Sequence, residues 1–80
     1  MISIDVQKTG RNIKRLCTER GLSVKALSTH FPYQSLQAIY NWLQGKNLPS
    51  PENMLTLGMI LDLPLEQLYY YSQSQNDRRA

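Results

Sequence analysis

Residues 22–50 read LSVKALSTHFPYQSLQAIYNWLQGKNLPS, and this stretch decides the fold because it holds two short helical patterns with a break between them. Ser23 is a suitable N-cap, since its side-chain oxygen can accept a hydrogen bond from a backbone N–H of the first turn. It predicts a helix from Val24 to about residue 29 or 30. Phe31-Pro32-Tyr33 ends that helix, because proline disfavours helical dihedrals at the residue before it.

A second short helix is predicted from Leu36 to Gln44, with Ser35 as its N-cap and Gly45 at its end. On a helical wheel its apolar side chains gather on one side, where they can anchor the helix in a core. These are Ile39, Trp42 and Leu43. Side chains that form hydrogen bonds point the other way, and none of them is acidic. They are Gln37, Tyr40, Asn41 and Gln44.

Helical patterns flank this pair on both sides. The stretch Asp5–Arg20 places apolar residues at helical spacing and stops at Gly21. Ser50 precedes a proline, which combines an N-cap with a favoured first helical residue, and a helix is expected from there through Leu61. Leu65–Tyr71 suits a short fifth helix. No strand pattern and no internal repeat is found, so the sequence predicts an all-α fold.

The expected architecture is a compact bundle of about five helices in one domain over residues 1–71. Residues 72–80 are Ser, Gln, Asn, Asp, Arg and Ala, and we expect them to form a disordered polar tail. Eighty residues allow one small domain and no second one. A chain of this length has difficulty enclosing a catalytic pocket of several hundred cubic ångströms. Length alone therefore argues against an ordinary enzyme.

Charge is distributed unevenly along the chain. Residues 1–46 carry seven basic and two acidic side chains, a formal charge of +5. Residues 47–77 carry four acidic and no basic side chains, a formal charge of −4, and Arg78 and Arg79 bring the total to +3. A polyanionic partner is therefore expected to face the first half of the chain. The alternative is that the first helix has a solvated basic face with no partner.

Two short helices joined by a tight break, inside a small helical domain, are the parts of a helix-turn-helix DNA reader. Residues 22–28 and 37–50 resemble the lambda-repressor-like, Cro-type (XRE) helix-turn-helix family in their order: a Leu-Ser start, an Ile three residues before Trp, then Gly-Lys and Leu-Pro-Ser. Residues 54–68 extend the resemblance, which covers about residues 9–68. The family consists mostly of transcriptional repressors and regulators from bacteria, phages and plasmids, many of which bind palindromic operators as dimers.

The sequence departs from the family pattern in three places. The break between the two helices is one residue longer than usual and has Pro32 where glycine is common. Val24 stands where many members have a glutamine, so a phosphate contact from that side chain is lost. Leu43 replaces a frequent glutamate after the tryptophan, which removes a polar support without disturbing the docking of the helix.

The resemblance and the chemistry of the helix over Leu36–Gln44 together nominate the site residues. Gln and Asn can each pair with adenine through two hydrogen bonds, and a leucine can contact a thymine methyl. The expected base-reading residues are Leu36, Gln37, Tyr40, Asn41 and Gln44. Phosphates are expected at the helix N-terminus and at exposed basic or polar side chains nearby. The expected phosphate contacts are Ser35, Lys46, Asn47, Lys25 and Arg11.

Other residues with possible chemistry have simpler explanations. Trp42 is predicted to be a core residue, and His30 has no second ligand at a useful spacing, so no metal is expected. Cys17 lies on the apolar stripe of the first helix and is predicted to be an inert buried thiol. No apolar run approaches the length of a membrane span, and no signal peptide is recognised. A cytoplasmic, nucleoid-associated protein without cofactor or small-molecule ligand is expected.

Tyr69, Tyr70 and Tyr71 cannot all face one small core, so two of them should be at least partly exposed. Aromatic side chains favour interfaces, and a dimer contact at these three residues is a hypothesis. The predicted function is sequence-specific binding of double-stranded DNA by a transcriptional repressor that forms a homodimer on a palindromic operator. The alternative is a protein-interaction module, such as the antitoxin of a toxin–antitoxin pair. Nothing in the sequence supports an enzyme, because no nucleophile has a base beside it and no glycine loop could hold a phosphate.

Overall fold

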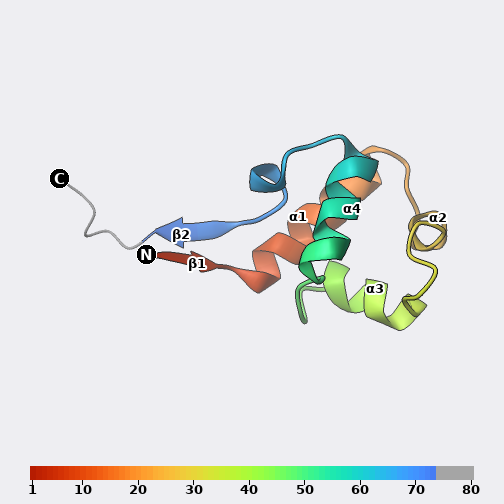
Figure 1. Ribbon diagram of the computed structural model, residues 1–80, viewed down its shortest axis with the longest axis horizontal. Coiled ribbons are helices and arrows are strands. Elements are labelled where there is room, and N and C mark those ends of the chain that lie inside the picture. The colour runs from red at the N-terminus through yellow and green to blue at the C-terminus, as the bar shows by residue number, and fades with distance from the viewer. Residues whose placement is uncertain (74–80) are drawn as a thin grey trace.

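A computed structural model of the chain describes residues 1–73 and is mainly helical within them (Figure 1). Four α-helices and one 3₁₀ turn form the body, and one short strand lies at each end of the described residues. In chain order the elements are β1 (Ile2–Ile4), α1 (Val6–Glu19), α2 (Val24–Ser28), α3 (Leu36–Leu43), α4 (Pro51–Leu61), η1 (Leu65–Gln67) and β2 (Tyr71–Gln73). The mainly helical prediction is confirmed.

Each of the four α-helices begins at a residue whose side chain accepts a hydrogen bond from the first turn. Asp5 caps α1, and its Oδ1 lies 2.9 Å from the amide nitrogen of Lys8. Serines cap the other three helices, as predicted. They are Ser23, Ser35 and Ser50. Local cap chemistry therefore sets the helix starts, and the observed starts agree with the predicted ones to within one residue.

A single apolar core lies between α1, α3 and α4. Its buried members come from all four helices, the α2–α3 linker and the segment after η1. They are Ile13, Leu16, Cys17, Leu27, Phe31, Ile39, Trp42, Leu43, Met54, Leu57, Leu61 and Leu68. Trp42 and Cys17 are both buried, which confirms the two core assignments made from the sequence. The core holds α3 by one face and leaves its other face to solvent.

The prediction that the chain has no strands is wrong. β1 and β2 form an antiparallel pair in the register Ile2 with Gln73, Ser3 with Ser72 and Ile4 with Tyr71. Each strand is three residues long, so neither has enough alternation to be recognised alone, and the pairing joins residues about 70 positions apart. Ser72 and Gln73 belong to this pair although they fall within the predicted tail; residues 74–80 lie outside the described residues.

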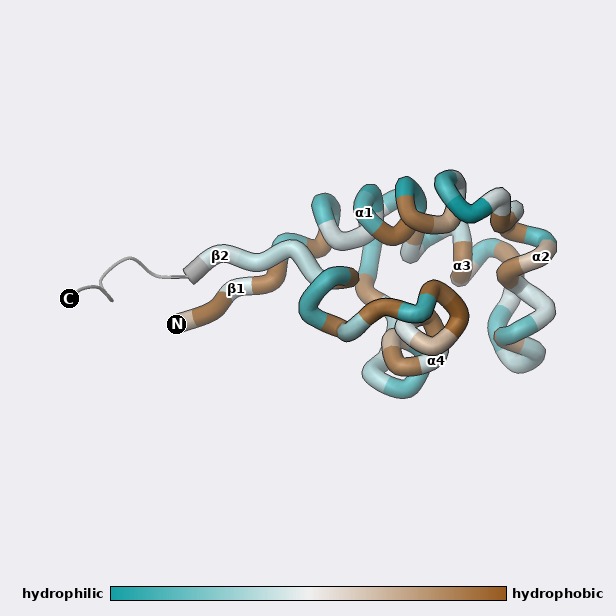
Figure 2. The backbone as a smooth tube through the Cα atoms, turned by 90° about the horizontal axis from the view of Figure 1, so that it is seen from above, coloured by the Kyte–Doolittle hydropathy of each residue, from teal (hydrophilic) through white to brown (hydrophobic). Residues whose placement is uncertain are grey.

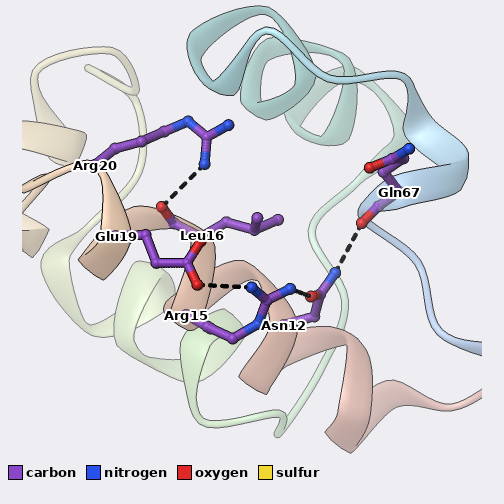
Figure 3. Close-up of polar contacts among 6 residues, drawn as sticks. All are labelled: Asn12, Arg15, Leu16, Glu19, Arg20 and Gln67. Atoms are coloured by element: carbon purple, nitrogen blue, oxygen red, sulfur yellow. Dashed lines mark hydrogen bonds and ion pairs between the residues drawn. The ribbon is translucent and has the colours of Figure 1, made fainter.

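The predicted fifth helix over Leu65–Tyr71 is also wrong beyond its first turn. Only a 3₁₀ turn forms, because a buried side chain of α1 binds the backbone that a helix would have used. Asn12 Nδ2 donates to the carbonyl oxygen of Gln67 at 2.8 Å (Figure 3) and to that of Leu68 at 3.0 Å. The chain then leaves the turn in an extended conformation towards β2.

Thr9 extends this attachment by one turn of α1. Its hydroxyl oxygen accepts a hydrogen bond from the amide nitrogen of Tyr70 at 2.9 Å and lies 3.4 Å from the Tyr70 carbonyl oxygen. That carbonyl also accepts a bond from the amide nitrogen of Asp5 at 2.8 Å. Thr9 is fully buried, so its polar group is satisfied by these contacts. Thr9 and Asn12 thus fasten the C-terminal segment to α1.

Candidate nucleic-acid interface

The helices α2 and α3 pack against each other, and a buried aromatic side chain fixes the linker between them. Phe31 lies in the linker of residues 29–35 and is 4% exposed. Its ring meets that of Trp42 edge to face, with centroids 5.2 Å apart and an interplanar angle of 79°. The linker that the sequence identified only as a helix break is therefore anchored in the core, and it holds the start of α3 in place.

The other end of α3 is fixed by a close approach to α1. Gly45 follows the helix with φ of +76°, and a side chain there would come within 2.7 Å of the Cα atom of Gln7. A side chain at Gly10 would overlap the carbonyl oxygen of Trp42 and come within 2.7 Å of the Gly45 Cα atom. Backbone therefore touches backbone at this crossing, and both positions exclude any side chain. These contacts set the direction in which α3 presents its outer face.

The predicted base-reading residues lie along the solvent side of α3. Leu36 is 51% exposed and Tyr40 is 45% exposed, although both are large side chains. Gln37 and Gln44 are exposed, and Asn41 is half-buried. The structure thus leaves the five nominated residues exposed or half-buried on α3 and its C-cap Gln44, whereas Ile39, Trp42 and Leu43 are buried. Figure 1 shows α3 at the lower edge of the molecule, with α1 and α4 on the same side of it.

Two of these residues are joined by a side-chain hydrogen bond. Gln37 Nε2 donates to Asn41 Oδ1 at 2.9 Å, one helical turn away. This bond uses one N–H of the Gln37 side-chain amide and does not involve its Oε1 atom or its second N–H. An acceptor and a donor side by side on one amide are the groups that complement the N6 and N7 edge of adenine. The pair therefore orients Gln37 without using the groups that would read a base.

Three of the predicted phosphate contacts lie at the two ends of α3. Ser35 Oγ accepts a hydrogen bond from the amide nitrogen of Ala38 at 3.0 Å, and its O–H remains able to donate. Lys46 and Asn47 are exposed directly after Gly45, and the Lys46 amide nitrogen binds the Asn41 carbonyl oxygen at 2.9 Å. Lys25 is exposed on α2. Residues 20–51 contain no acidic side chain, so nothing in this region repels a phosphate.

Arg11 occupies a different setting from the other predicted phosphate contacts. It lines a shallow hollow together with Lys8, Asn12, Arg15 and Tyr70. Arg15 in this hollow is engaged by Glu19 at 2.8 Å and by the Asn12 Oδ1 atom at 2.7 Å (Figure 3). Three basic residues of α1 therefore lie together beside Tyr70, and no residue of α3 lines the hollow.

The three consecutive tyrosines are divided as the sequence predicted, with two of them exposed. Tyr69 packs partly buried against the core, whereas Tyr70 and Tyr71 are 48% and 49% exposed. Tyr71 lies in β2, and the backbone of Tyr70 is bound to α1. The two exposed rings thus belong to the strand pair and its junction with the helical body.

Val24 and Leu43 both contribute to the packing of the core. Val24 packs partly buried against the core, where a polar side chain would lose its water. Leu43 is 6% exposed, so the position after Trp42 is part of the core in this chain.

Burial raises the pKa of the Cys17 thiol above its usual value, with Arg20 opposing the shift, which fits an unreactive thiol. Within residues 1–73 no cluster of potential metal ligands occurs.

The sequence did not predict four residues with structural roles: Gly10 and Phe31 hold the two ends of α3, and Thr9 and Asn12 hold the C-terminal segment. Thr9 and Asn12 are polar residues on the buried side of α1, Gly10 is a glycine inside a long helix, and Phe31 belongs to the break at Pro32. Of these, Gly10 carried a usable signal, because a glycine in a helix interior costs about 1 kcal/mol and usually has a packing reason.

Comparison with known proteins identified no relative of this chain. No family model, no curated protein and no solved structure matches the chain. Among the described residues, no helix combines the length and the apolar character needed to cross a membrane.

Proposed function

We propose that this protein binds double-stranded DNA in a sequence-specific manner, with α2 and α3 acting as a helix-turn-helix and α3 entering the major groove. The observation that carries the proposal is the outer face of α3. It presents exposed Leu36, Gln37 and Tyr40 on a helix whose opposite face is anchored in the core. A major groove accepts one α-helix, and the side chains that distinguish base pairs there are amides and apolar groups of this kind.

Base reading is assigned chiefly to Gln37, with Asn41 as the residue that holds it. The 2.9 Å bond between the two amides restricts the rotamers of Gln37 before DNA binds. A residue ordered in advance loses less conformational entropy on binding. Leu36 would contact a thymine methyl, and Tyr40 and Gln44 would reach neighbouring base edges or sugars.

Phosphate contacts are assigned to the two ends of α3 and to α2. The Ser35 hydroxyl and the α3 N-terminus would meet one phosphate, and Lys46 with Asn47 would meet another. Lys25 extends the basic surface along α2. The absence of acidic residues between positions 20 and 51 supports this path for the phosphate backbone.

The proposed biological role is that of a transcriptional repressor or autoregulator acting in the cytoplasm of a bacterium or on a mobile element. A single reader of this size contacts few base pairs, so a homodimer on a palindromic operator would supply the specificity. The two copies of α3 would then lie about 34 Å apart, which is one turn of the duplex.

Selection of binding sites from a randomised duplex DNA pool, at about physiological salt, tests the proposal. We expect an enriched site whose preference at one position disappears in Gln37→Ala, with a loss of about 1–3 kcal/mol on the selected site. Gln67→Ala is the matched control, because its exposed side chain lies in η1, remote in sequence from α3. A pool without enrichment, or equal losses for the two variants, would contradict the proposal and favour a protein-interaction module.

A further inference from the structure

The strand pair of β1 and β2 is the least covered part of the described chain. All three residues of β1 are exposed, and Figure 1 shows the pair extending away from the helical body. A sheet of two strands has two free edges, and a pair this short is marginal in water by itself. The strand pair is therefore an exposed template to which a further strand can add.

The register shows which backbone groups of β1 are free. The Asp5 amide nitrogen donates to the Tyr70 carbonyl oxygen, so residues 5 and 70 share a hydrogen-bonded position of the ladder. Such positions alternate along an antiparallel pair, which makes Ser3 and Ser72 the next hydrogen-bonded pair. The N–H and C=O groups of Ile2 and Ile4 consequently point away from β2. Among residues 1–73 these two donors and two acceptors have no partner in the strand pair and face solvent.

Both isoleucines of β1 lie on one face of the strand pair. Ile2 and Ile4 lie on the same face because side chains alternate along a strand, and Tyr71 lies opposite Ile4 on that face. These three side chains are 56%, 37% and 49% exposed. Figure 2 shows the apolar character of the N-terminal strand at the outer end of the molecule. A free edge and an uncovered apolar face thus coincide at β1.

We propose that a second copy of this chain pairs with β1, strand β1 against strand β1 in antiparallel orientation, with the two-fold axis at Ser3. In that register Ile2 of each copy meets Ile4 of the other, and all four free backbone groups of each edge find partners. The sequence Ile-Ser-Ile is symmetric about its centre, so the same residues serve both copies. β-branched cross-strand pairs are favourable in antiparallel sheets, which favours β1 over β2 as the pairing edge.

Charge argues for this occupant over others. Neither strand contains a charged residue, so two copies meet without repulsion. A nucleic acid or an anionic surface would find no Lys or Arg in the strand pair to bind. Residues 74–80, SQNDRRA, contain no large apolar side chain that could cover the exposed isoleucines. A second copy would supply hydrogen-bond partners for the free edge of β1 and an apolar surface against which Ile2 and Ile4 can pack.

Disulfide trapping without DNA tests the register. In the proposed sheet the two Ser3 Cα atoms lie about 4.5 Å apart, within reach of a disulfide, whereas the two Ser72 Cα atoms lie about 14 Å apart across three strand spacings. Under mild oxidation we expect Ser3→Cys to give a covalent dimer and Ser72→Cys to remain monomeric. The native Cys17 is 3% exposed and should stay silent in both. Cross-linking of Ser72→Cys alone would instead establish pairing through β2 and overturn the proposal.

Sedimentation equilibrium of the unmodified chain, from micromolar to millimolar concentration, tests the association itself. The interface is small, so we expect a weak dimer. Ile4→Glu places two carboxylates on the shared face and should raise the dissociation constant at least about tenfold, a change of about 1.4 kcal/mol. Met59→Glu is the control, because it places the same charge at another exposed apolar residue, 81% exposed on α4 and outside the strand pair.

The outcomes separate this proposal from that of DNA binding. A chain that stays monomeric at every concentration, or a dimer that both glutamate variants weaken equally, overturns pairing through β1. Neither result bears on base reading by α3, because no DNA is present in these measurements. Circular dichroism of each variant verifies that the helical body is intact, and the cysteine pair decides the register even if Ile4→Glu fails to fold.

Discussion

Thr9 and Asn12 are buried polar residues whose hydrogen bonds hold two distant parts of the chain together. Both bind backbone groups of residues 67–70 from the interior side of α1. Satisfied bonds of this kind contribute modestly to stability, but an unpaired buried group costs about 1–3 kcal/mol. The apolar stripe of the first helix was predicted correctly at Ile13 and Leu16, yet a stripe defined by apolar residues alone passes over polar residues at the same spacing.

Thr9→Val should lower the free energy of unfolding by about 1–3 kcal/mol, because it leaves the Tyr70 amide without its hydroxyl partner. Thr18→Val is the control, since Thr18 is an exposed threonine on the same helix and shares its helix propensity. Urea denaturation followed by circular dichroism measures both. Equal stabilities of the two variants would show that water replaces the Thr9 contact.

Cys17 gives the chain a pH dependence of known sign. Burial raises the pKa of its thiol, so the unfolded chain ionises at a lower pH than the folded chain. The free energy of unfolding is unaffected below the unfolded thiol pKa of about 8.5 and should fall as the pH rises from there towards the folded pKa. Cys17→Ala should lose stability at neutral pH through its cavity but lack this alkaline decrease. Urea titrations at several pH values measure the free energy of unfolding of both proteins. If it fell equally with pH in both above pH 8.5, the alkaline decrease would not come from Cys17.

At the scale of elements, the contact between α1 and the end of α3 depends on Gly10. Alanine favours a helix over glycine by about 1 kcal/mol, so propensity alone predicts that Gly10→Ala is stabilising. The overlap with Trp42 and Gly45 predicts the opposite, a loss of about 1–3 kcal/mol, because backbone atoms cannot move aside as a flexible side chain can. Thermal unfolding decides the sign. Lys14→Ala, an exposed position on the same helix, should leave the melting temperature nearly unchanged, and a gain for Gly10→Ala would refute the close approach.

The elements that could be predicted from the sequence are those with local signals. Ser23, Ser35 and Ser50 mark helix starts through bonds to residues three positions away, so the pattern and the structure coincide there. The strand pair and the lost fifth helix depend on contacts between residues more than 50 positions apart. A local sequence pattern cannot predict contacts between residues so far apart in the chain. The outer face of α3 was predictable because helical periodicity alone places its residues, whereas the Gln37–Asn41 bond needed the side-chain geometry.

At the scale of the whole molecule, charge and shape divide the protein into three regions. The outer face of α3 and the loop after it lack acidic residues, and Lys8, Arg11 and Arg15 of α1 line a separate hollow beside Tyr70. Within residues 48–73 the acidic side chains are Glu52 on α4, Asp62 at its C-cap and Glu66 in η1. The strand pair is uncharged. A polyanion, a second copy and solvent would therefore each face a different part of the same small domain.

This division makes the salt dependence of DNA binding diagnostic. Lys46→Gln removes a cation directly after α3 and should lower the slope of log K against log salt by about 0.9, with similar losses on specific and random DNA. Arg11→Gln should change the slope less, because Arg11 shares its hollow with Tyr70 and Arg15 and with no residue of α3. Fluorescence anisotropy titrations at several salt concentrations give both slopes. If the Arg11 variant lost as much slope as the Lys46 variant, the basic face of α1 would lie against the duplex, and the DNA path would have to be redrawn across α1.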